Sequence, residues 1–180
     1  MNLIRNAGYL LIFLVMFSCS KQEPRKPIIR KTGSFLSESV KRNIAINKIE
    51  EDLLKVKMQK DSLHQYINSE NGFWYFYQVK DSLDHKTPVK GDLAIFTYEV
   101  KNLKDEVLFS KEEIGEIQYY VGKQEMMAGL HDGIQLMKEG ETVTFLFPSY
   151  KAYGYAGNEK VRSNEPLIFT VELLKINKNK

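Results

Sequence analysis

The sequence predicts an α+β protein in which a curved antiparallel β-sheet wraps around one short helix, with a helical extension at its N-terminal side. From Gly72 onward, several short segments alternate between apolar and polar residues with the two-residue period of β-strands. One stretch within this region, 124–138, instead has apolar residues at helical spacing. A longer helical pattern precedes the strands, so a helical extension is expected before the sheet.

Five segments carry the strand pattern. The first is dense in aromatic residues, and the second alternates regularly between apolar and polar residues. The expected strands are 72–79, 92–101, 117–121, 141–147 and 167–176. Between the third and fourth, Met127, Leu130, Ile134 and Met137 recur every three or four residues, which predicts the helix. The order β-β-β-α-β-β favours a sheet packed against one helix.

The extension is predicted as a helix from about Glu38 to Ile67, and Asn71-Gly72 closes the helical region. Its apolar positions, spaced mostly by three, four and seven, are Leu36, Val40, Ile49, Leu53, Val56, Leu63 and Ile67. Two roles stay open for this segment. In the first role, the segment packs on the following domain or separates that domain from a membrane. In the second role, it mediates dimerisation. The small number of heptads favours the first role.

The N-terminus is typical of a targeting signal. Arg5 precedes an apolar run from Gly8 to Phe17, which is shorter than the ~20 residues that a membrane-spanning helix needs. The run ends at Ser18-Cys19 and polar residues follow, an arrangement that resembles a bacterial lipoprotein signal. The resemblance implies that a lipid is attached to Cys19 and that the protein is anchored to a bacterial membrane, inner or outer, with its domain in the periplasm.

Composition excludes several other classes. The net charge of +3 comes from dispersed Lys and Arg, so no nucleic-acid partner is expected. A single cysteine rules out a disulfide within the chain, and the three histidines lack the spacing of a metal site. The sequence contains no Gly-rich phosphate loop and no G-x-S-x-G motif. We therefore expect chemistry that involves neither a covalent intermediate nor a dedicated proton transfer.

Several consecutive motifs over roughly residues 89–177 resemble those of one known family. The helix region reads Tyr120-Val-Gly-Lys-Gln-Glu-Met-Met-Ala-Gly-Leu-His-Asp-Gly-Ile, and Lys138-Glu-Gly-Glu-Thr-Val-Thr-Phe follows. Pro148-Ser-Tyr-Lys-Ala-Tyr-Gly resembles the family's Pro-x-x-x-Ala-Tyr-Gly loop, and 167–174 resembles its last strand. Upstream, 91–98 and 107–110 resemble its early strands. Each motif alone is weak, but their joint order and spacing are specific, and together they resemble the FKBP-type prolyl isomerases.

The resemblance implies an FKBP-like fold and peptidyl-prolyl isomerase (rotamase) activity on proline-containing polypeptides. It places a proline pocket in the domain, with Leu130 as its floor and Val161 on a late loop. The walls that it implies are Tyr98, Phe109, Ile117, Met126, Met127, Tyr153 and Phe169. In the family, the backbone N–H at the position of Met127 and the hydroxyl at Tyr153 bind ligand carbonyls. No metal or organic cofactor is implied.

Two positions depart from the family pattern. Leu130 stands where the family usually has Trp, and Ser110 stands where Asp usually follows the wall phenylalanine. The late loop, 161–166, also lacks the usual Ile-Pro pair. These changes predict weaker binding of substrates and macrolides. They also keep open a second function, that of an FKBP-fold binding module or chaperone with little catalysis.

The whole chain also resembles the gliding-motility-associated FKBP-type lipoproteins of Bacteroidetes. The similar segments are the signal, the helical region, Gly72-Phe-Trp-Tyr and Glu139-Gly-Glu-Thr-Val-Thr-Phe-Leu-Phe-Pro-Ser. This resemblance implies a role in protein folding for gliding motility or protein secretion, with proteins of those machines as partners. The expected organisation is a signal peptide (1–18), a flexible tether (19–34), the helical extension (35–70) and the isomerase domain (71–180).

Overall fold

The computed structural model describes residues 32–82 and 86–179. The chain divides into two compact units, Met1–Ser37 and Glu38–Lys180. Cys19, the predicted signal peptide and residues 19–31 of the predicted tether lie outside the described residues. In the ranges that are described, no helix is long and apolar enough to cross a membrane.

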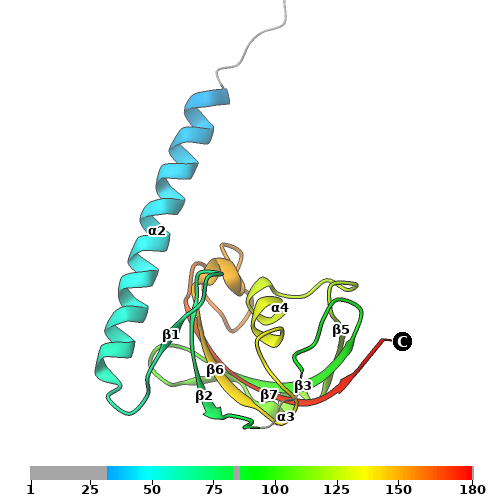
Figure 1. Cartoon of the computed structure of the whole chain (residues 1–180). Coiled ribbons are helices and arrows are strands. Elements are labelled where there is room, and N and C mark those ends of the chain that lie inside the picture. Colours follow the sequence, from blue (N-terminus) through cyan, green and yellow to red (C-terminus); the bar gives the residue numbers. More distant parts are fainter. Residues whose placement is uncertain (1–31, 83–85, 180) are drawn as a thin grey trace, which may run out of the picture. The chain divides into compact units, whose positions relative to one another are not determined.

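The second unit is built on an antiparallel sheet in the order β1-β2-β6-β7-β3-β4, with β5 also paired to β3. Figure 1 shows the sheet curving around α4 (Ala128–Ile134), the arrangement that the sequence predicts. The strands are β1 (Ile67–Asn68), β2 (Trp74–Val79), β3 (Leu93–Lys101), β4 (Val107–Phe109), β5 (Ile117–Tyr120), β6 (Thr142–Phe147) and β7 (Leu167–Asn177). Five of them lie within two residues of the predicted limits. The short strand β4 falls on 107–110, which the family resemblance indicated as a strand, and the structure adds the short strand β1.

Two glycines let α4 lie close against the sheet. A Cβ atom on Gly129 would come within 2.9 Å of the Phe147 ring, and one on Gly133 within 3.0 Å of the Phe145 ring. The helix is shorter than the predicted 124–138, because Met127 has extended backbone angles (φ −52°, ψ 129°) and turns replace the helix after Ile134. Two shorter helical segments, α3 (Lys111–Ile114) and η1 (Ser149–Lys151), were not predicted.

The helical extension is α2 (Thr32–Lys60), which begins and ends earlier than the predicted 38–67. Asp61 explains the end of the helix. Its carboxylate accepts hydrogen bonds from the Leu63 N–H (3.1 Å) and the Tyr66 hydroxyl (2.8 Å), and it pairs with the His64 ring (2.8 Å). Such local bonds compete with helix continuation. The predicted limits therefore need correction: 32–34 are helical, whereas 61–70 are not.

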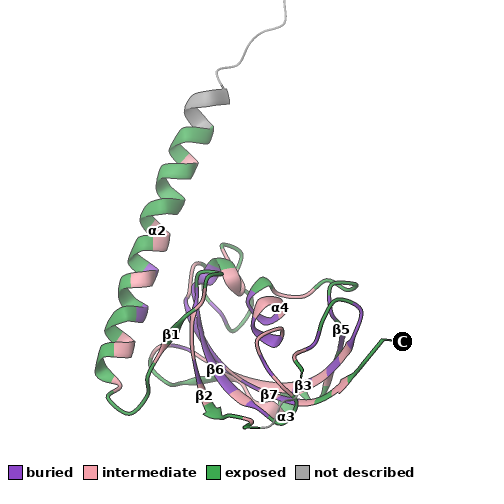
Figure 2. Ribbon diagram, in the orientation of Figure 1, coloured by how far each residue is buried: buried purple, intermediate pink, exposed green. Residues whose placement is uncertain are grey.

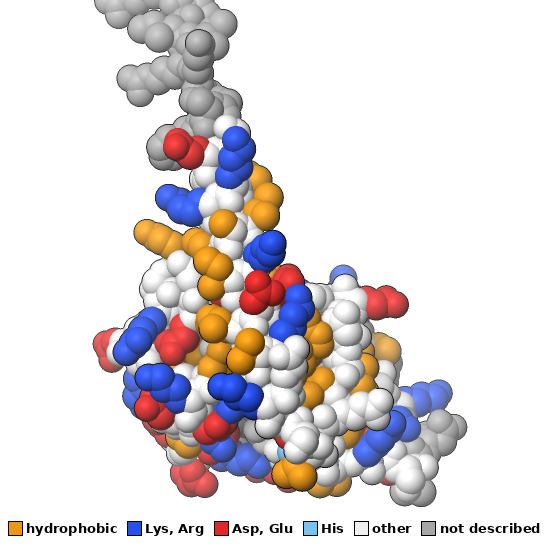
Figure 3. Space-filling model, turned by 90° about the vertical axis from the view of Figure 1, so that its left-hand side faces the viewer, with side chains coloured by type: hydrophobic (Ala, Val, Ile, Leu, Met, Phe, Trp, Pro, Cys, Tyr) orange, Lys and Arg blue, Asp and Glu red, His pale blue; other side chains and the backbone are white. Residues whose placement is uncertain are grey.

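The C-terminal half of α2 packs on the outer face of the sheet with a different side than the predicted apolar stripe. Leu54 is fully buried against Leu146 of β6 and Ile168 of β7. The large apolar residues of the predicted stripe stay between 40% and 88% exposed, and Figures 2 and 3 show the exposed and hydrophobic surface along α2. Spacing alone did not identify the packed side, because that side also carries the buried Glu50.

The C-terminal end of the chain is fixed by buried Asp92. Its carboxylate accepts hydrogen bonds from the Val89 N–H (2.9 Å), the Asn179 N–H (2.9 Å) and the Lys178 ammonium (2.9 Å). Burial alone would raise the pKa of Asp92, but these three donors outweigh it and lower the pKa to about 2. The residue therefore favours the folded state only while it is ionised.

We expect Leu54→Ala to lower the free energy of unfolding by about 2–5 kcal/mol, because it leaves a cavity between α2 and the sheet. Chemical denaturation measures this loss. The matched control is Leu53→Ala, one residue earlier and 48% exposed, which should change stability by about 1 kcal/mol or less. Equal losses for the two variants would contradict the observed packing.

The stabilising effect of Asp92 should depend on pH. A carboxylate with a lowered pKa in the folded state stabilises fully above its unfolded pKa of ~3.9 and loses this effect as the pH falls towards 2. The difference in unfolding free energy between wild type and Asp92→Asn should therefore shrink from pH 5 to pH 2. Denaturant titrations at each pH measure it. A constant difference would argue against this role.

Candidate active site

The nine predicted pocket residues all belong to one hydrophobic cluster on the inner face of the sheet. Leu130, Val161 and Phe169 are buried in it. The partly exposed residues that pack against the cluster include the other six, Tyr98, Phe109, Ile117, Met126, Met127 and Tyr153. The fold thus brings together an apolar surface of half-exposed side chains above a buried apolar base.

Strand register places three of the wall residues side by side. Val100 of β3 pairs with Phe109 on β4 and with Phe169 on β7, so these residues lie in one row across the sheet. Tyr98 is two residues earlier on β3 and therefore points to the same face. Its ring stacks on Phe169 with a centroid distance of 5.7 Å and an interplanar angle of 24°.

The fourth aromatic wall residue, Tyr153, comes from the loop after η1. Its ring stacks on Phe109 at 6.0 Å and 17°. Burial raises the pKa of both Tyr98 and Tyr153, and the charge of an ionised Tyr98 would raise that of Tyr153 further. Both hydroxyls therefore remain protonated near neutral pH and are available as hydrogen-bond donors.

The start of α4 contributes the methionines. Met127 is the N-cap residue, and its carbonyl accepts the His131 N–H at 2.9 Å. Leu130 follows on the first turn with 1% exposure. Leucine is smaller than the tryptophan that the family resemblance implies at this position, so the buried side chain here is apolar but not aromatic.

The late loop is held over Phe109. The Asn158 side chain accepts the Val161 N–H at 2.8 Å, and the Val161 carbonyl accepts the Asn158 N–H at 2.9 Å. The Lys160 ammonium lies 4.8 Å from the centre of the Phe109 ring and forms an ion pair with Glu113. Val161, predicted to lie at the pocket, is a buried member of the cluster.

Ser110 has a local role in the structure. It is the N-cap residue of α3, and its hydroxyl accepts the Glu113 N–H at 3.3 Å. Serine is a good N-cap, so Ser110 has a structural role at the start of α3.

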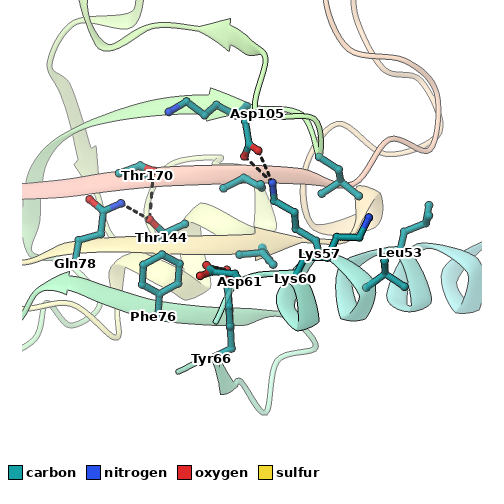
Figure 4. A pocket seen from close by; sticks show the side chains of 15 residues that line it. Leu53, Lys57, Lys60, Asp61, Tyr66, Phe76, Gln78, Asp105, Thr144 and Thr170 are labelled. Atoms are coloured by element: carbon teal, nitrogen blue, oxygen red, sulfur yellow. Dashed lines mark hydrogen bonds and ion pairs between the residues drawn. The ribbon is translucent and has the colours of Figure 1, made fainter. Parts of the chain in front are cut away.

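A groove of about 710 Å³ lies on the opposite, outer face of the sheet (Figure 4). Side chains alternate between faces along a strand, so Thr144 and Leu146 of β6 line the groove while Phe145 points to the inner cluster. Lys57 of α2 and Asp105 form an ion pair of 2.6 Å at its edge. The groove was not predicted from the sequence, because residues of α2 form one of its walls.

Sequence reasoning also missed a buried contact behind the Tyr153 loop. Glu50 of α2 accepts two hydrogen bonds from Ser149, which lies 99 residues later in the chain. No local pattern separates Glu50 from the neighbouring carboxylates on α2. Only its burial, at 2% exposure, marks it.

The site has the composition of a hydrophobic binding surface. Its polar groups are the tyrosine hydroxyls and backbone amides. Across the described residues, no three His, Cys, Asp or Glu side chains are grouped so that they could hold a metal ion. Such a surface suits an apolar ligand whose carbonyls need a few well-placed donors.

Comparisons with known proteins agree with this geometry. The family model of the FKBP-type peptidyl-prolyl cis-trans isomerases matches residues 84–174. A probable FKBP-type peptidyl-prolyl cis-trans isomerase FkpA of Neisseria meningitidis serogroup B is 34% identical over 103 residues. This match covers 56% of the chain but only 37% of that longer protein.

Solved structures share the fold at lower identity. FkpA from Escherichia coli aligns with a TM-score of 0.58 and 18% identity, over 96% of this chain and 82% of its own. A peptidyl-prolyl cis-trans isomerase from Pseudomonas syringae gives 0.59 and 16%, over 74% and 95%. The N-terminal domain of FKBP42 from Arabidopsis thaliana gives 0.58 and 19%, over 66% and 96%. The fold, the matched segment and the relatives lead to one conclusion: the chain belongs to the FKBP-type peptidyl-prolyl cis-trans isomerase family.

Proposed function

We propose that this protein catalyses cis/trans isomerisation of peptidyl-prolyl bonds at the surface formed by Tyr98, Phe109, Tyr153 and Phe169. The observation that carries the proposal is the meeting of these four rings, which come from three strands and one loop. Family membership makes a proline-containing polypeptide the natural ligand.

The reaction itself requires only a lowered rotational barrier. Rotation about a peptide bond costs ~18–20 kcal/mol, because resonance gives the C–N bond partial double-bond character. In the twisted transition state this resonance is lost and the amide is less polar. An apolar surface lined by aromatic rings therefore favours the twisted state over the planar, well-solvated amide.

Two donors would orient the substrate. The Tyr153 hydroxyl, which stays protonated, and the Met127 N–H at the start of α4 would bind the carbonyls that flank the rotating bond. Ile117, Met126, Leu130 and Val161 would enclose the proline ring. Holding the flanking groups while one bond turns lowers the entropic cost of the reaction.

We place this activity outside the cytoplasm, on exported proteins, with the chain anchored to a membrane by a lipid on Cys19. The apolar run before Cys19 and the polar residues after it support this location. The resemblance of 72–75 and 139–149 to gliding-motility lipoproteins favours clients or partners in a gliding or secretion machine.

A second function is favoured by the leucine at position 130. Without the aromatic floor, the domain would bind proline-containing partners and catalyse slowly, as a binding module or chaperone. Complementation of a gene deletion separates the two functions, because a variant that has lost isomerase activity would restore the phenotype only if binding alone suffices.

We expect Tyr153→Phe and Phe169→Ala to lower kcat/KM for a proline tetrapeptide by about 10-fold or more, since each removes a group that contacts the twisted bond or its neighbours. A protease-coupled assay on the mature chain measures this rate. The matched control is Tyr155→Phe, because Tyr155 is 82% exposed and only two residues away. Unchanged rates for both site variants, with an active wild type, would show that the site lies elsewhere.

Cell fractionation tests the proposed anchor. Cys19→Ser should release the protein from membranes, and globomycin should cause the unprocessed precursor to accumulate. Each buried lipid methylene contributes ~0.8 kcal/mol to membrane binding, so loss of the acyl chains should be decisive. Normal processing in the presence of globomycin would refute lipidation.

A further inference from the structure

We propose that Glu50, on the N-terminal helix, is a positioning residue for the isomerase site: its buried carboxylate fixes the turn that carries Tyr153. The inference rests on the proposed function, in which Tyr153 contacts the substrate. Glu50 lies outside the segment that matches the family model, 84–174. The site would thus be completed by a helix that the family model does not include.

The contact joins two fully enclosed residues. The Ser149 N–H donates to Glu50 Oε2 at 2.6 Å, and the Ser149 hydroxyl donates to Oε1 at 2.7 Å. Glu50 is 2% exposed and Ser149 is 3% exposed. The low dielectric of the interior strengthens such hydrogen bonds, because water does not compete for the donors and acceptors. Ser149 is therefore held at a defined position relative to α2.

Ser149 in turn holds the backbone on both sides of Tyr153. Its carbonyl accepts hydrogen bonds from the N–H groups of Ala152 (2.8 Å) and Gly154 (2.8 Å), which lie on either side of Tyr153. Ser149 is therefore hydrogen-bonded both to Glu50 and to the two sequence neighbours of Tyr153. A displacement of Ser149 would move the Tyr153 ring against Phe109, on which it stacks.

The next two residues of η1 are held by other elements. The Tyr150 hydroxyl donates to the Gly72 carbonyl at 3.1 Å, and Lys151 pairs with Asp132 of α4 at 2.7 Å. Tyr150 is 44% exposed, and the Lys151 and Asp132 side chains are 17% and 21% exposed. The Glu50 contact is the most buried of the three, so water competes with it least.

The packing of α2 on the sheet places the Glu50 carboxylate beside Ser149. Leu54 is one helical turn after Glu50 on the same side and is buried against Leu146 and Ile168. Leu146 lies near the end of β6, from which the chain continues through Pro148 to Ser149. The same docking that buries Leu54 thus brings Glu50 to Ser149.

The test uses the full-length mature chain with three substitutions. Glu50→Leu removes both acceptors and should lower kcat/KM about 10-fold or more by misplacing Tyr153. Glu50→Gln should stay within about 2-fold of wild type, because its amide oxygen still accepts the Ser149 N–H while its NH₂ donates to the hydroxyl. The control Asp52→Asn, which changes a carboxylate that is 62% exposed, should have no effect.

Amide chemical shifts and hydrogen exchange of Ala152, Tyr153 and Gly154 provide a readout that does not depend on activity. We expect large changes there in Glu50→Leu, with recovery in Glu50→Gln. A folded Glu50→Leu variant with wild-type kcat/KM and unchanged shifts at these amides would overturn the inference. If this variant does not fold, Ser149→Ala, which removes one of the two bonds, decides the question: unchanged shifts at 152–154 overturn the inference.

The two proposals fail in different ways. An inactive wild type would refute the proposed function, and the amide shifts would still show whether Glu50 positions the loop. If the wild type is active but substitution of Glu50 changes neither the amide shifts of the loop nor kcat/KM, only the positioning role is refuted.

Discussion

The alternation of side chains along β6 and β7 is the constraint on which the rest of the structure depends. Successive residues of a strand point to opposite faces, so Phe145 and Phe169 enter the inner cluster while Leu146 and Ile168 face outward. One pair of strands therefore supports two different surfaces. The inner surface carries the candidate active site, and the outer surface receives the N-terminal helix.

On the inner face, the site depends on how closely α4 approaches the sheet. Gly129 and Gly133 lie against the rings of Phe147 and Phe145, where a larger residue would collide. This approach brings Leu130 into the cluster against which the half-exposed Tyr98, Phe109 and Tyr153 pack. The arrangement needs no charged group, which agrees with a reaction whose barrier is the loss of amide resonance rather than a proton transfer.

On the outer face, the burial of Leu54 brings a carboxylate into the protein interior. Burial of a polar group is unfavourable unless hydrogen bonds satisfy it, and Ser149 donates one hydrogen bond to each oxygen of the Glu50 carboxyl group. Where α2 meets the turn that precedes Tyr153, the Glu50 carboxyl group and the two Ser149 donors therefore satisfy each other's hydrogen bonds. The outward apolar side chains of α2 remain exposed, and two of them, Leu53 and Val56, line the groove on this face.

The sequence by itself determined the strands, the single helix across the sheet and the family, because these depend on local periodicity and on motifs of fixed spacing. The nine residues that the family resemblance proposed for the site lie in one hydrophobic cluster of the fold. Tertiary structure alone decided where α2 ends, which of its sides packs, and that Glu50 is buried beside Ser149. The physical reason is distance along the chain: these features arise from contacts between residues up to 99 positions apart, or from hydrogen bonds such as those of Asp61 that override helical periodicity.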